Sequence, residues 1–216
     1  MNQGIYIDSV FLSFGDQKIL RGIYLELEFQ QITGILGSNG SGKSCLLKII
    51  TGQLKPQSKH LKFNGKRLDH LYKEKGLINY LPQHECHPKS ARLHQLIRYY
   101  GIDLDAFVYH YPAMQRQLKT RFSDLSGGDR RIVEVLICIE APSKLTILDE
   151  PFTHIMPLQV EVVKKAIKRV KSRKGIVITD HQYRHVLEIS DCLYLLKEGR
   201  LEQISDEKDL KQKGYI

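Results

Sequence analysis

The feature that most constrains the fold of this chain is a glycine-rich segment between two apolar runs. Residues 37–44 read Gly-Ser-Asn-Gly-Ser-Gly-Lys-Ser and match the pattern G-x-x-x-x-G-K-[ST]. The run 32–36 before it predicts a short buried strand, and the run 45–50 after it predicts a helix. Glycines let successive backbone N–H groups turn inward, and the start of the helix adds a positive dipole. The sequence therefore predicts a strand, loop and helix that bind phosphate groups.

Two pairs of residues indicate which chemistry the predicted phosphate-binding loop supports. Lys43 can reach the β- and γ-phosphates of a nucleoside triphosphate, and the Ser44 hydroxyl can coordinate Mg²⁺. The apolar run 145–148 ends in Asp149, which can hold Mg²⁺, and Glu150, a candidate general base that polarises an attacking water. The alternatives are a glycine turn without a ligand and two solvated carboxylates. The combination of both motifs favours a nucleotide site.

The rest of the chain alternates predicted strands with predicted helices. The expected strands are 5–7, 10–12, 22–29, 32–36, 145–148, 176–178, 192–196 and 200–204. The expected helices are 45–50, a weaker stretch at 89–121 with breaks at Gly101 and Pro112, and one that begins near Pro157. This order predicts an α/β domain with a mostly parallel core. The length of 216 residues fits one domain with a small inserted lobe.

Further motifs, taken with these, resemble those of the ABC-family ATPases. Leu-Ser-Gly-Gly-Asp at 125–129 is similar to the LSGGQ signature and ends 20 residues before Asp149. Tyr-Leu-Pro-Gln at 80–83 resembles the Q-loop, and Thr-Asp-His at 179–181 resembles the H-loop with its switch histidine. Phe14 stands where the family has an aromatic that stacks on adenine, although an ordinary core position is the alternative. The resemblance extends over nearly the whole chain.

This resemblance implies a fold, an activity and a set of site residues. The implied fold is a P-loop NTPase core with a mostly parallel sheet, an antiparallel N-terminal β subdomain and a small helical lobe near 85–125, all within one ABC ATPase domain at 1–216. The implied activity is ATP hydrolysis, with Glu150, His181 and Gln83 as catalytic residues and Ser44, Gln83 and Asp149 serving Mg²⁺. The implied ATP-binding residues are Phe14, Gly37, Ser38, Asn39, Gly40, Ser41, Gly42, Lys43, Ser44, Cys45, Ser126, Gly127 and Gly128.

The resemblance also implies partners. In this family the signature of one subunit closes on the phosphate loop of the other, so a homodimer is expected with ATP. Integral-membrane permease subunits on separate chains are expected as well, which places this chain in the cytoplasm, peripheral at the inner face of the membrane. The sequences Asp-Glu-Pro-Phe at 149–152 and Thr-Asp-His at 179–181 are similar to those of the lipopolysaccharide-export and branched-chain amino-acid branches of the family.

Three departures from the family pattern bear on the subunit contact. Asp129 ends the signature where glutamine or glutamate is usual, which adds a negative charge. Met156 takes the place of the aspartate that ends the D-loop, the segment after Asp149-Glu150-Pro151 through which the two subunits communicate. The stretch 83–125 is short for the helical lobe, so the surface that meets a membrane subunit is expected to be reduced or unusual.

Targeting and metal-binding signals are weak. No apolar run reaches the 18 residues of a membrane span, and the N-terminus has neither a basic nor an apolar leader segment. The four cysteines are scattered without a C-x-x-C pair, as in reduced cytosolic proteins. His-Glu-Cys-His at 84–87 crowds metal-ligating residues, but no second cluster completes a tetrahedral site, so a solvated polar loop is favoured.

The charge leaves two alternative functions open. Lysines and arginines outnumber acids by 33 to 24, a net charge of +9, and the stretch 55–75 has seven basic residues against two acidic ones. This favours an anionic membrane surface nearby or, as an alternative, a soluble ABC ATPase that acts on nucleic acid or ribosomes. The lysines from Lys164 to Lys174 are interpreted as a solvated helix face, and nucleic acid is not expected. Met156 motivates a second alternative, a regulatory subunit with low turnover.

Overall fold

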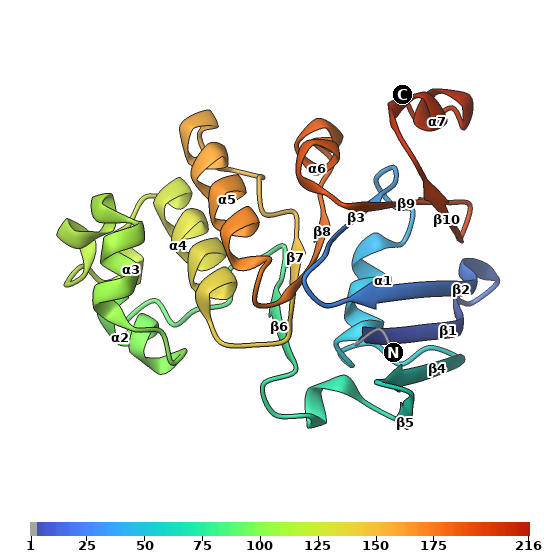
Figure 1. Ribbon diagram of the computed structural model, residues 1–216, viewed down its shortest axis with the longest axis horizontal. Helices are drawn as coiled ribbons and strands as arrows, with labels where there is room; N and C mark the ends of the chain where they lie inside the picture. Colours follow the sequence, from blue (N-terminus) through green and yellow to red (C-terminus); the bar gives the residue numbers. More distant parts are fainter. Residues whose placement is uncertain (1–3) are drawn as a thin grey trace.

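The computed structural model describes residues 4–216 and contains two sheets (Figure 1). The N-terminal sheet is antiparallel, in the order β2-β1-β4-β5. Its strands are β1 (Gly4–Phe14), β2 (Gln17–Glu28), β4 (Ser58–Phe63) and β5 (Lys66–Leu68). The first two strands form a hairpin around Gly15, whose φ of 55° suits the turn. The antiparallel N-terminal subdomain is therefore confirmed.

The second sheet has six strands in the order β10-β9-β3-β8-β7-β6. All neighbouring pairs are parallel except β9 and β10, the strands predicted at 192–196 and 200–204, which form an antiparallel hairpin. The mostly parallel core is therefore confirmed. The strands are β3 (Ile32–Leu36), β6 (Ile78–Leu81), β7 (Leu145–Asp149), β8 (Gly175–Thr179), β9 (Cys192–Lys197) and β10 (Arg200–Ile204).

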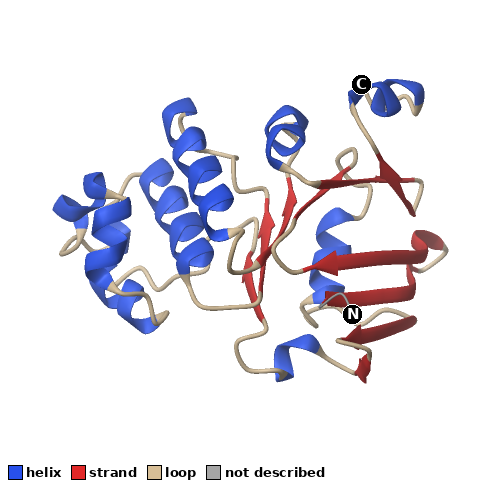
Figure 2. Cartoon of the chain, in the orientation of Figure 1, coloured by secondary structure: helices blue, strands red, loops and turns tan. Residues whose placement is uncertain are grey.

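Helices cover both faces of this second sheet (Figure 2). On one face α1 (Lys43–Ile50) packs between the two sheets, in a core with Ile35, Ile147 and Val177. On the other face α4 (Gly127–Glu140), α5 (Pro157–Val170) and α6 (Tyr183–Ile189) share a core with Ile176 and Ile178. Alternate residues of β8 thus face opposite cores, as a buried parallel strand requires.

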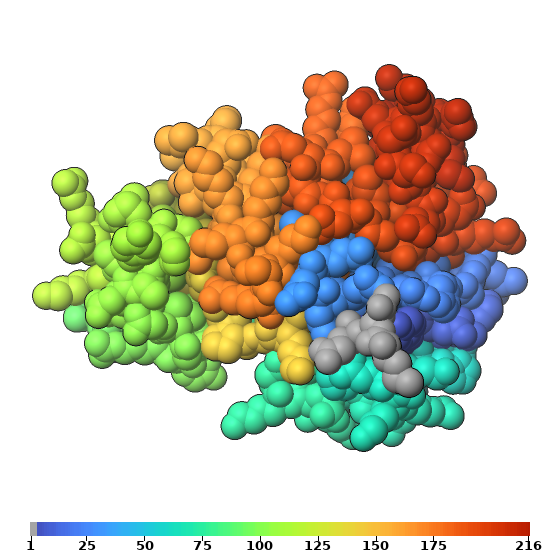
Figure 3. Space-filling view, in the orientation of Figure 1, coloured from blue at the N-terminus to red at the C-terminus, as the bar shows by residue number. Residues whose placement is uncertain are grey.

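The helical lobe lies at the far side of α4 and forms one end of the molecule (Figure 3). It contains α2 (Leu93–Tyr99), α3 (Leu104–His110) and the 3₁₀ turns η2 (Pro112–Gln117) and η3 (Phe122–Asp124); η1 (Leu71–Lys73) and α7 (Glu207–Gln212) lie outside it. The predicted breaks are confirmed, because Gly101 has a φ of 69° after α2 and Pro112 follows α3. Its apolar side chains, Phe107 and Phe122 among them, join the core under α4 and α5.

The prediction of a solvated lysine face is wrong at two positions. Lys164 is 4% exposed and contacts Glu161 at 2.9 Å and Glu188 at 2.5 Å. Lys174 is 2% exposed, and its ammonium donates to the carbonyls of Ile139 and Ala141 at 2.8 and 2.6 Å. Burial lowers the pKa of Lys174 to about 8. Both lysines hold the fold together and leave the surface less basic than the sequence pattern indicated.

None of the helices within residues 4–216 has the length and apolar character needed to cross a bilayer.

Candidate functional site

The glycine-rich loop 37–42 connects β3 to α1 and wraps around the side chain of Lys43. The Lys43 ammonium donates hydrogen bonds to the carbonyls of Gly37 at 2.7 Å and Ser38 at 3.1 Å. The Ser41 amide donates to the Ser38 carbonyl at 3.1 Å and closes the turn. The predicted strand, loop and helix are confirmed, and the loop curves around one cation.

Two glycines make this curvature possible. A Cβ at Gly37 would lie 2.6 Å from the Leu196 carbonyl oxygen and 2.6 Å from Ser41 Oγ, so a side chain there would clash. Gly42 has a φ of 104°, a conformation that L-residues with a side chain rarely adopt. The motif needs glycine at both positions for steric reasons.

The start of α1 is suited to an anion. Gly42 is its N-cap and offers no side-chain hydrogen bond, and the first turn contains no acidic residue. The first amides of the helix and its positive dipole end therefore face a ligand without competition from the chain. Ser41 Oγ is also buried without a hydrogen-bond partner among the described residues. These features fit a phosphate group.

Lys43 is electrostatically poised for the same group. It is 6% exposed, and burial lowers the pKa of its ammonium while the negative charges of Glu150, Asp149 and Asp180 oppose that shift. A buried cation with several carboxylates nearby is well placed to neutralise an incoming phosphate.

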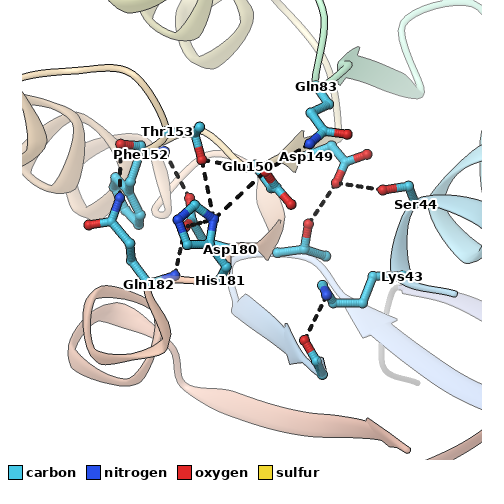
Figure 4. Close-up of polar contacts among 12 residues, drawn as sticks. Lys43, Ser44, Gln83, Asp149, Glu150, Phe152, Thr153, Asp180, His181 and Gln182 are labelled. Atoms are coloured by element: carbon cyan, nitrogen blue, oxygen red, sulfur yellow. Dashed lines mark hydrogen bonds and ion pairs between the residues drawn. The ribbon is translucent and has the colours of Figure 1, made fainter. Parts of the chain in front are cut away.

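Asp149 ends β7 beside the first turn of α1 (Figure 4). Its Oδ1 accepts hydrogen bonds from Ser44 Oγ at 3.3 Å and Thr179 Oγ1 at 2.9 Å, and its Oδ2 accepts one from the Tyr80 hydroxyl at 3.4 Å. The carboxylate is 1% exposed. Burial of the phenol, followed by the nearby charge of Asp149, raises the pKa of Tyr80. A carboxylate and a hydroxyl are oxygen donors of the type Mg²⁺ prefers, so Asp149 and Ser44 fit this ion.

The backbone of Glu150 leaves the extended conformation of β7. Its φ is 53°, and its amide still donates to the Thr179 carbonyl at 2.8 Å. Its carboxylate accepts a hydrogen bond from Gln83 Nε2 at 3.0 Å and lies 3.8 Å from His181 Nδ1 (Figure 4). A non-glycine residue in this region is strained, and such strain is typical of functional positions. The structure thus brings Glu150, Gln83 and His181 together from three separate segments.

His181 occupies the open side of this cluster. Its side chain is 47% exposed, and Nδ1 lies 3.5 Å from Thr153 Oγ1. The preceding Asp180 is fully buried and accepts hydrogen bonds from the amides of Phe152 at 3.0 Å and Gln182 at 2.9 Å. Asp180 thereby ties the backbone next to His181 to the segment of Phe152, while the imidazole itself stays accessible to solvent.

Arg131 on α4 is a residue of this region that sequence reasoning missed. Its guanidinium is buried and donates to the carbonyls of Pro82 at 2.9 Å, Asp149 at 2.9 Å and Glu150 at 3.0 Å. It joins the segment of Gln83, the end of β7 and α4 in one fork of hydrogen bonds. The available signal was a basic residue in the apolar stretch 131–139.

The signature residues lie apart from this cluster. Ser126 is the N-cap of α4, and its Oγ accepts from the Asp129 amide at 3.1 Å and donates to the Asp129 carboxylate at 2.8 Å. Ser126 and Gly127 are exposed, and no hydrogen bond among the described residues joins 126–128 to the loop 37–44. Asp129, at the third position of the helix, therefore completes the cap formed by Ser126.

Phe14 is 53% exposed at the end of β1, so the interpretation as a core residue is wrong. It pairs with Gln17 across the hairpin turn. Ile19, two residues further along β2, lies beside Gly42, where a Cβ would meet it at 3.0 Å. Cys45 lies half-buried in the first turn of α1, next to Ser44.

The fold and this arrangement together define a P-loop nucleoside triphosphatase. A parallel strand leads into the phosphate loop, a neighbouring strand ends in Asp149 and Glu150, and an uncapped helix start lies between them. The family model described as ABC transporter matches residues 20–153, more than half of the chain, and the chain belongs to this family.

Individual relatives agree with this assignment. The ABC transporter ATP-binding protein YhaQ of Bacillus subtilis is 29% identical over 90% of this chain and 68% of its own length. The lipopolysaccharide export system ATP-binding protein LptB of Haemophilus influenzae is 26% identical over 93% of this chain and 92% of its own length. A solved ATP-binding subunit of an ABC transporter superimposes with a TM-score of 0.82 at 21% identity, over 97% of this chain and 93% of that one. The protein is an ABC-type ATP hydrolase.

Proposed function

We propose that this chain is the ATP-binding subunit of a transporter whose membrane-spanning subunits are separate chains. The observation that carries the proposal is the convergence of Lys43, Ser44, Asp149 and Glu150 at one end of the parallel sheet in a chain of the ABC transporter family. The ATP-binding relatives, LptB included, support a role in transport.

The roles of the site residues follow from their positions. The amides of 37–45 and the Lys43 ammonium bind the phosphates of ATP, and Lys43 exchanges its two carbonyl partners for phosphate oxygens. Ser44, Asp149 and Gln83 hold Mg²⁺, which when bound neutralises charge on the phosphates. Phe14 is exposed and stacks on the adenine.

Glu150 acts as the general base for the attacking water. Its carboxylate is 13% exposed, so water can reach it, and Gln83 and His181 contact it from opposite segments. Release of the Gln83 hydrogen bond would free the Glu150 carboxylate to accept a proton from that water. His181 binds on the γ-phosphate side of the reaction. The whole of 1–216 serves as one ATPase domain, with the lobe at 85–125.

The signature is proposed to act across a homodimer that forms with ATP. The amides at 126–128 open the helix α4 and have no hydrogen-bond acceptor among residues 4–216, which suits a phosphate supplied by the second subunit. Met156 and Leu158, at the start of α5, are 62% and 79% exposed, and apolar side chains at this level of exposure favour burial against a partner.

The helical lobe is proposed to dock on the membrane subunit at the cytoplasmic, inner face of the membrane. Tyr99 on α2 and Tyr109 on α3 are 83% and 82% exposed, and tyrosine is enriched at protein interfaces. Because Lys164 and Lys174 are buried, the basic surface behind the nucleic-acid alternative is smaller than the sequence indicated. This supports a transporter over an ATPase that acts on nucleic acid.

The experiment is an affinity purification of the tagged full chain from detergent-solubilised cells. We expect an integral membrane protein to co-purify, and the double substitution Tyr99→Ala with Tyr109→Ala to reduce its recovery. A matched control is Tyr24→Ala, because Tyr24 is 51% exposed on the antiparallel sheet, away from the lobe. Recovery of ribosomes or DNA without a membrane protein would overturn the proposal.

A further inference from the structure

A second cluster of ligand atoms lies between the segment after Gln83 and the helix α4. Cys86 Sγ, His87 Nδ1 and a Glu134 carboxylate oxygen lie within 4.8 Å of one another. Glu134 is fully buried, and the His87 side chain is 4% exposed. The sequence placed Cys86 and His87 in a solvated polar loop and missed Glu134, which lies 47 residues beyond His87. We propose that these three side chains bind a zinc ion.

The distances within the cluster fit a tetrahedral ion. Sγ lies 3.4 Å from Nδ1 and 3.8 Å from Glu134 Oε1, and Nδ1 lies 3.2 Å from Oε1. Bonds of about 2.3 Å to sulfur and about 2.0–2.2 Å to nitrogen and oxygen, at tetrahedral angles, separate the ligand atoms by about 3.3–3.6 Å. The three atoms therefore already stand near the corners of one face of such a tetrahedron.

The donor set favours zinc over magnesium. Sulfur, imidazole nitrogen and carboxylate oxygen are the three ligand types that Zn²⁺ accepts, whereas Mg²⁺ prefers oxygen alone. A thiolate and a carboxylate also supply two negative charges for a divalent cation. On binding, the Cys86 thiol releases its proton to solvent.

The surroundings supply an entry route and a fourth ligand. Cys86 is exposed, so an ion reaches the cluster from solvent. A cavity of about 50 Å³ borders Cys86 and His87 and is lined on its other side by Tyr100 and Cys138. This space accommodates a water molecule, which needs about 30 Å³. Three protein ligands and one water complete four-coordinate zinc.

The two carboxylate oxygens of Glu134 differ in the number of polar contacts that the protein gives them. Its Oε1 accepts the Cys86 amide at 2.9 Å and contacts Cys86 Sγ and His87 Nδ1 as well. Its Oε2 is buried and has no hydrogen bond within the part of the chain that the structure describes, and Arg131 Nη1 lies 3.5 Å away from it. Three polar atoms of two residues crowd one carboxylate oxygen while the other has no hydrogen bond among the described residues, and a cation among them relieves this imbalance.

Zinc at this position would tether the Q-loop segment to α4. Cys86 and His87 follow Gln83 by three and four residues, and Glu134 lies two turns into the helix that begins at the signature. The inference is independent of the transport proposal, because it rests on other side chains.

Cobalt substitution tests the inference. The full-length chain is stripped with a chelator and titrated with Co²⁺ without nucleotide, and Zn²⁺ affinity is measured by competition with a chromogenic chelator. We expect one equivalent of tetrahedral Co²⁺ with a sulfur-to-metal charge-transfer band. Cys86→Ser should abolish the band and weaken Zn²⁺ binding at least about tenfold. Cys192→Ser, at a half-buried thiol on β9, serves as the matched control and should leave both unchanged.

Glu134→Gln separates metal binding from folding, because the amide keeps the shape and can still accept the Cys86 amide. We expect it to weaken Zn²⁺ binding about tenfold or more. Zn²⁺ should also raise the Tm of the parent chain and not that of Cys86→Ser, which alters an exposed side chain and should fold. A missing sulfur band, or equal Zn²⁺ affinity in the parent and Cys86→Ser, would overturn the inference.

Discussion

The phosphate-loop region and the signature region of this chain differ in how far they are assembled. In the first, Lys43 and Asp149 are 6% and 1% exposed, and Ser44 contacts a residue 105 positions away in the sequence. In the second, Ser126 is bonded to Asp129 three positions away, and Met156 is 62% exposed. The hydrogen bond of Ser44 in the first region joins distant segments, whereas the hydrogen bonds of Ser126 in the second lie within the first turn of α4.

This difference bears on the proposal that one chain supplies half of a reaction centre. Long-range hydrogen bonds position the side chains of Ser44, Asp149 and Glu150 before any ligand arrives, so their ordering costs little on binding. The signature presents helix amides to solvent, and such amides remain satisfied by water until an anion replaces it. The first region therefore suits the proposed role of a preassembled half-site, and the second suits the surface proposed to meet the partner subunit.

Glu150→Gln should have the largest effect, because it removes the proposed base from the assembled region. Gln cannot accept the proton of the attacking water, so ATP turnover should fall by about 10²- to 10⁴-fold. ATP affinity should hold, since the Lys43 contacts to Gly37 and Ser38 do not involve this carboxylate. Phosphate release and binding of a fluorescent ATP analogue measure the two quantities.

Glu198→Gln is a close control for that variant. Glu198 has a φ of 52°, nearly the same as the 53° of Glu150, but it is exposed in the turn between β9 and β10. Its substitution should leave turnover unchanged. A Glu150→Gln chain that turns over at the parent rate would show that this carboxylate is not the base.

Mixing two inactive variants should test whether the signature acts across the dimer. Lys43→Ala disables the loop and Ser126→Arg disables the signature, so neither homodimer contains an intact site. A heterodimer combines the intact loop of one chain with the intact signature of the other. Random association gives half heterodimers with one site in two restored, so the mixture should recover about a quarter of parent activity.

The activity of the mixture distinguishes a site formed within one chain from a site shared between two chains. If loop and signature act within one chain, the mixture stays as inactive as its components at every ratio. The melting temperature of Ser126→Arg must first be compared with the parent, because loss of an N-cap destabilises a helix by about 1 kcal/mol. Steady-state ATPase assays at several mixing ratios provide the measurement.

Arg131→Lys should weaken the connection between the two regions. Arg131 lies on the helix that begins at the signature and donates to the carbonyls of Pro82, Asp149 and Glu150. A lysine ammonium lacks the planar fork and leaves buried carbonyls unpaired, so the free energy of unfolding should fall by about 1–3 kcal/mol. Chemical denaturation measures this, and turnover should fall with it.

Arg130→Lys is the neighbouring control. Arg130 contacts Glu85 at 3.0 Å with both side chains partly exposed, so the change should cost under about 1 kcal/mol. Equal unfolding free energies for the two variants would mean that the fork of Arg131 does not stabilise this junction.

The sequence was sufficient wherever a local pattern dictates local structure. The spacing of glycines and Lys43 predicted the loop because the backbone geometry there depends on residues within one turn, and Gly101 and Pro112 predicted the breaks of the lobe for the same reason. The regular alternation of strands and helices likewise predicted the parallel sheet.

It failed where the partner is distant in sequence. Lys174 looked solvated, yet carbonyls 33 and 35 positions earlier accept its hydrogen bonds. Arg131 and Glu134 gave no local sign that they contact Pro82 and Cys86, which lie on either side of Gln83. Charged residues in apolar surroundings acquire their roles from tertiary contacts, which periodicity does not encode.

Met156→Asp should have the smallest effect, and it acts on the less assembled region. Ser126 caps α4 with its side chain, whereas Met156 stands at the N-cap of α5 without a side-chain cap, in the extended conformation a cap requires. An aspartate accepts an orphan amide and complements the helix dipole, so stability should rise by about 0.5–1 kcal/mol and Tm by about 2–4 °C. Scanning fluorimetry measures the shift.

Met156→Asn and Met156→Ala divide this gain into its sources. Asparagine supplies the hydrogen bond without the charge and should retain most of the increase, while alanine supplies neither and should not raise Tm. If aspartate and alanine give the same Tm, the start of α5 does not limit stability. If aspartate raises Tm and also changes the ATP dependence of turnover, while asparagine raises Tm alone, then the charge acts across the proposed dimer contact and the methionine weakens communication there.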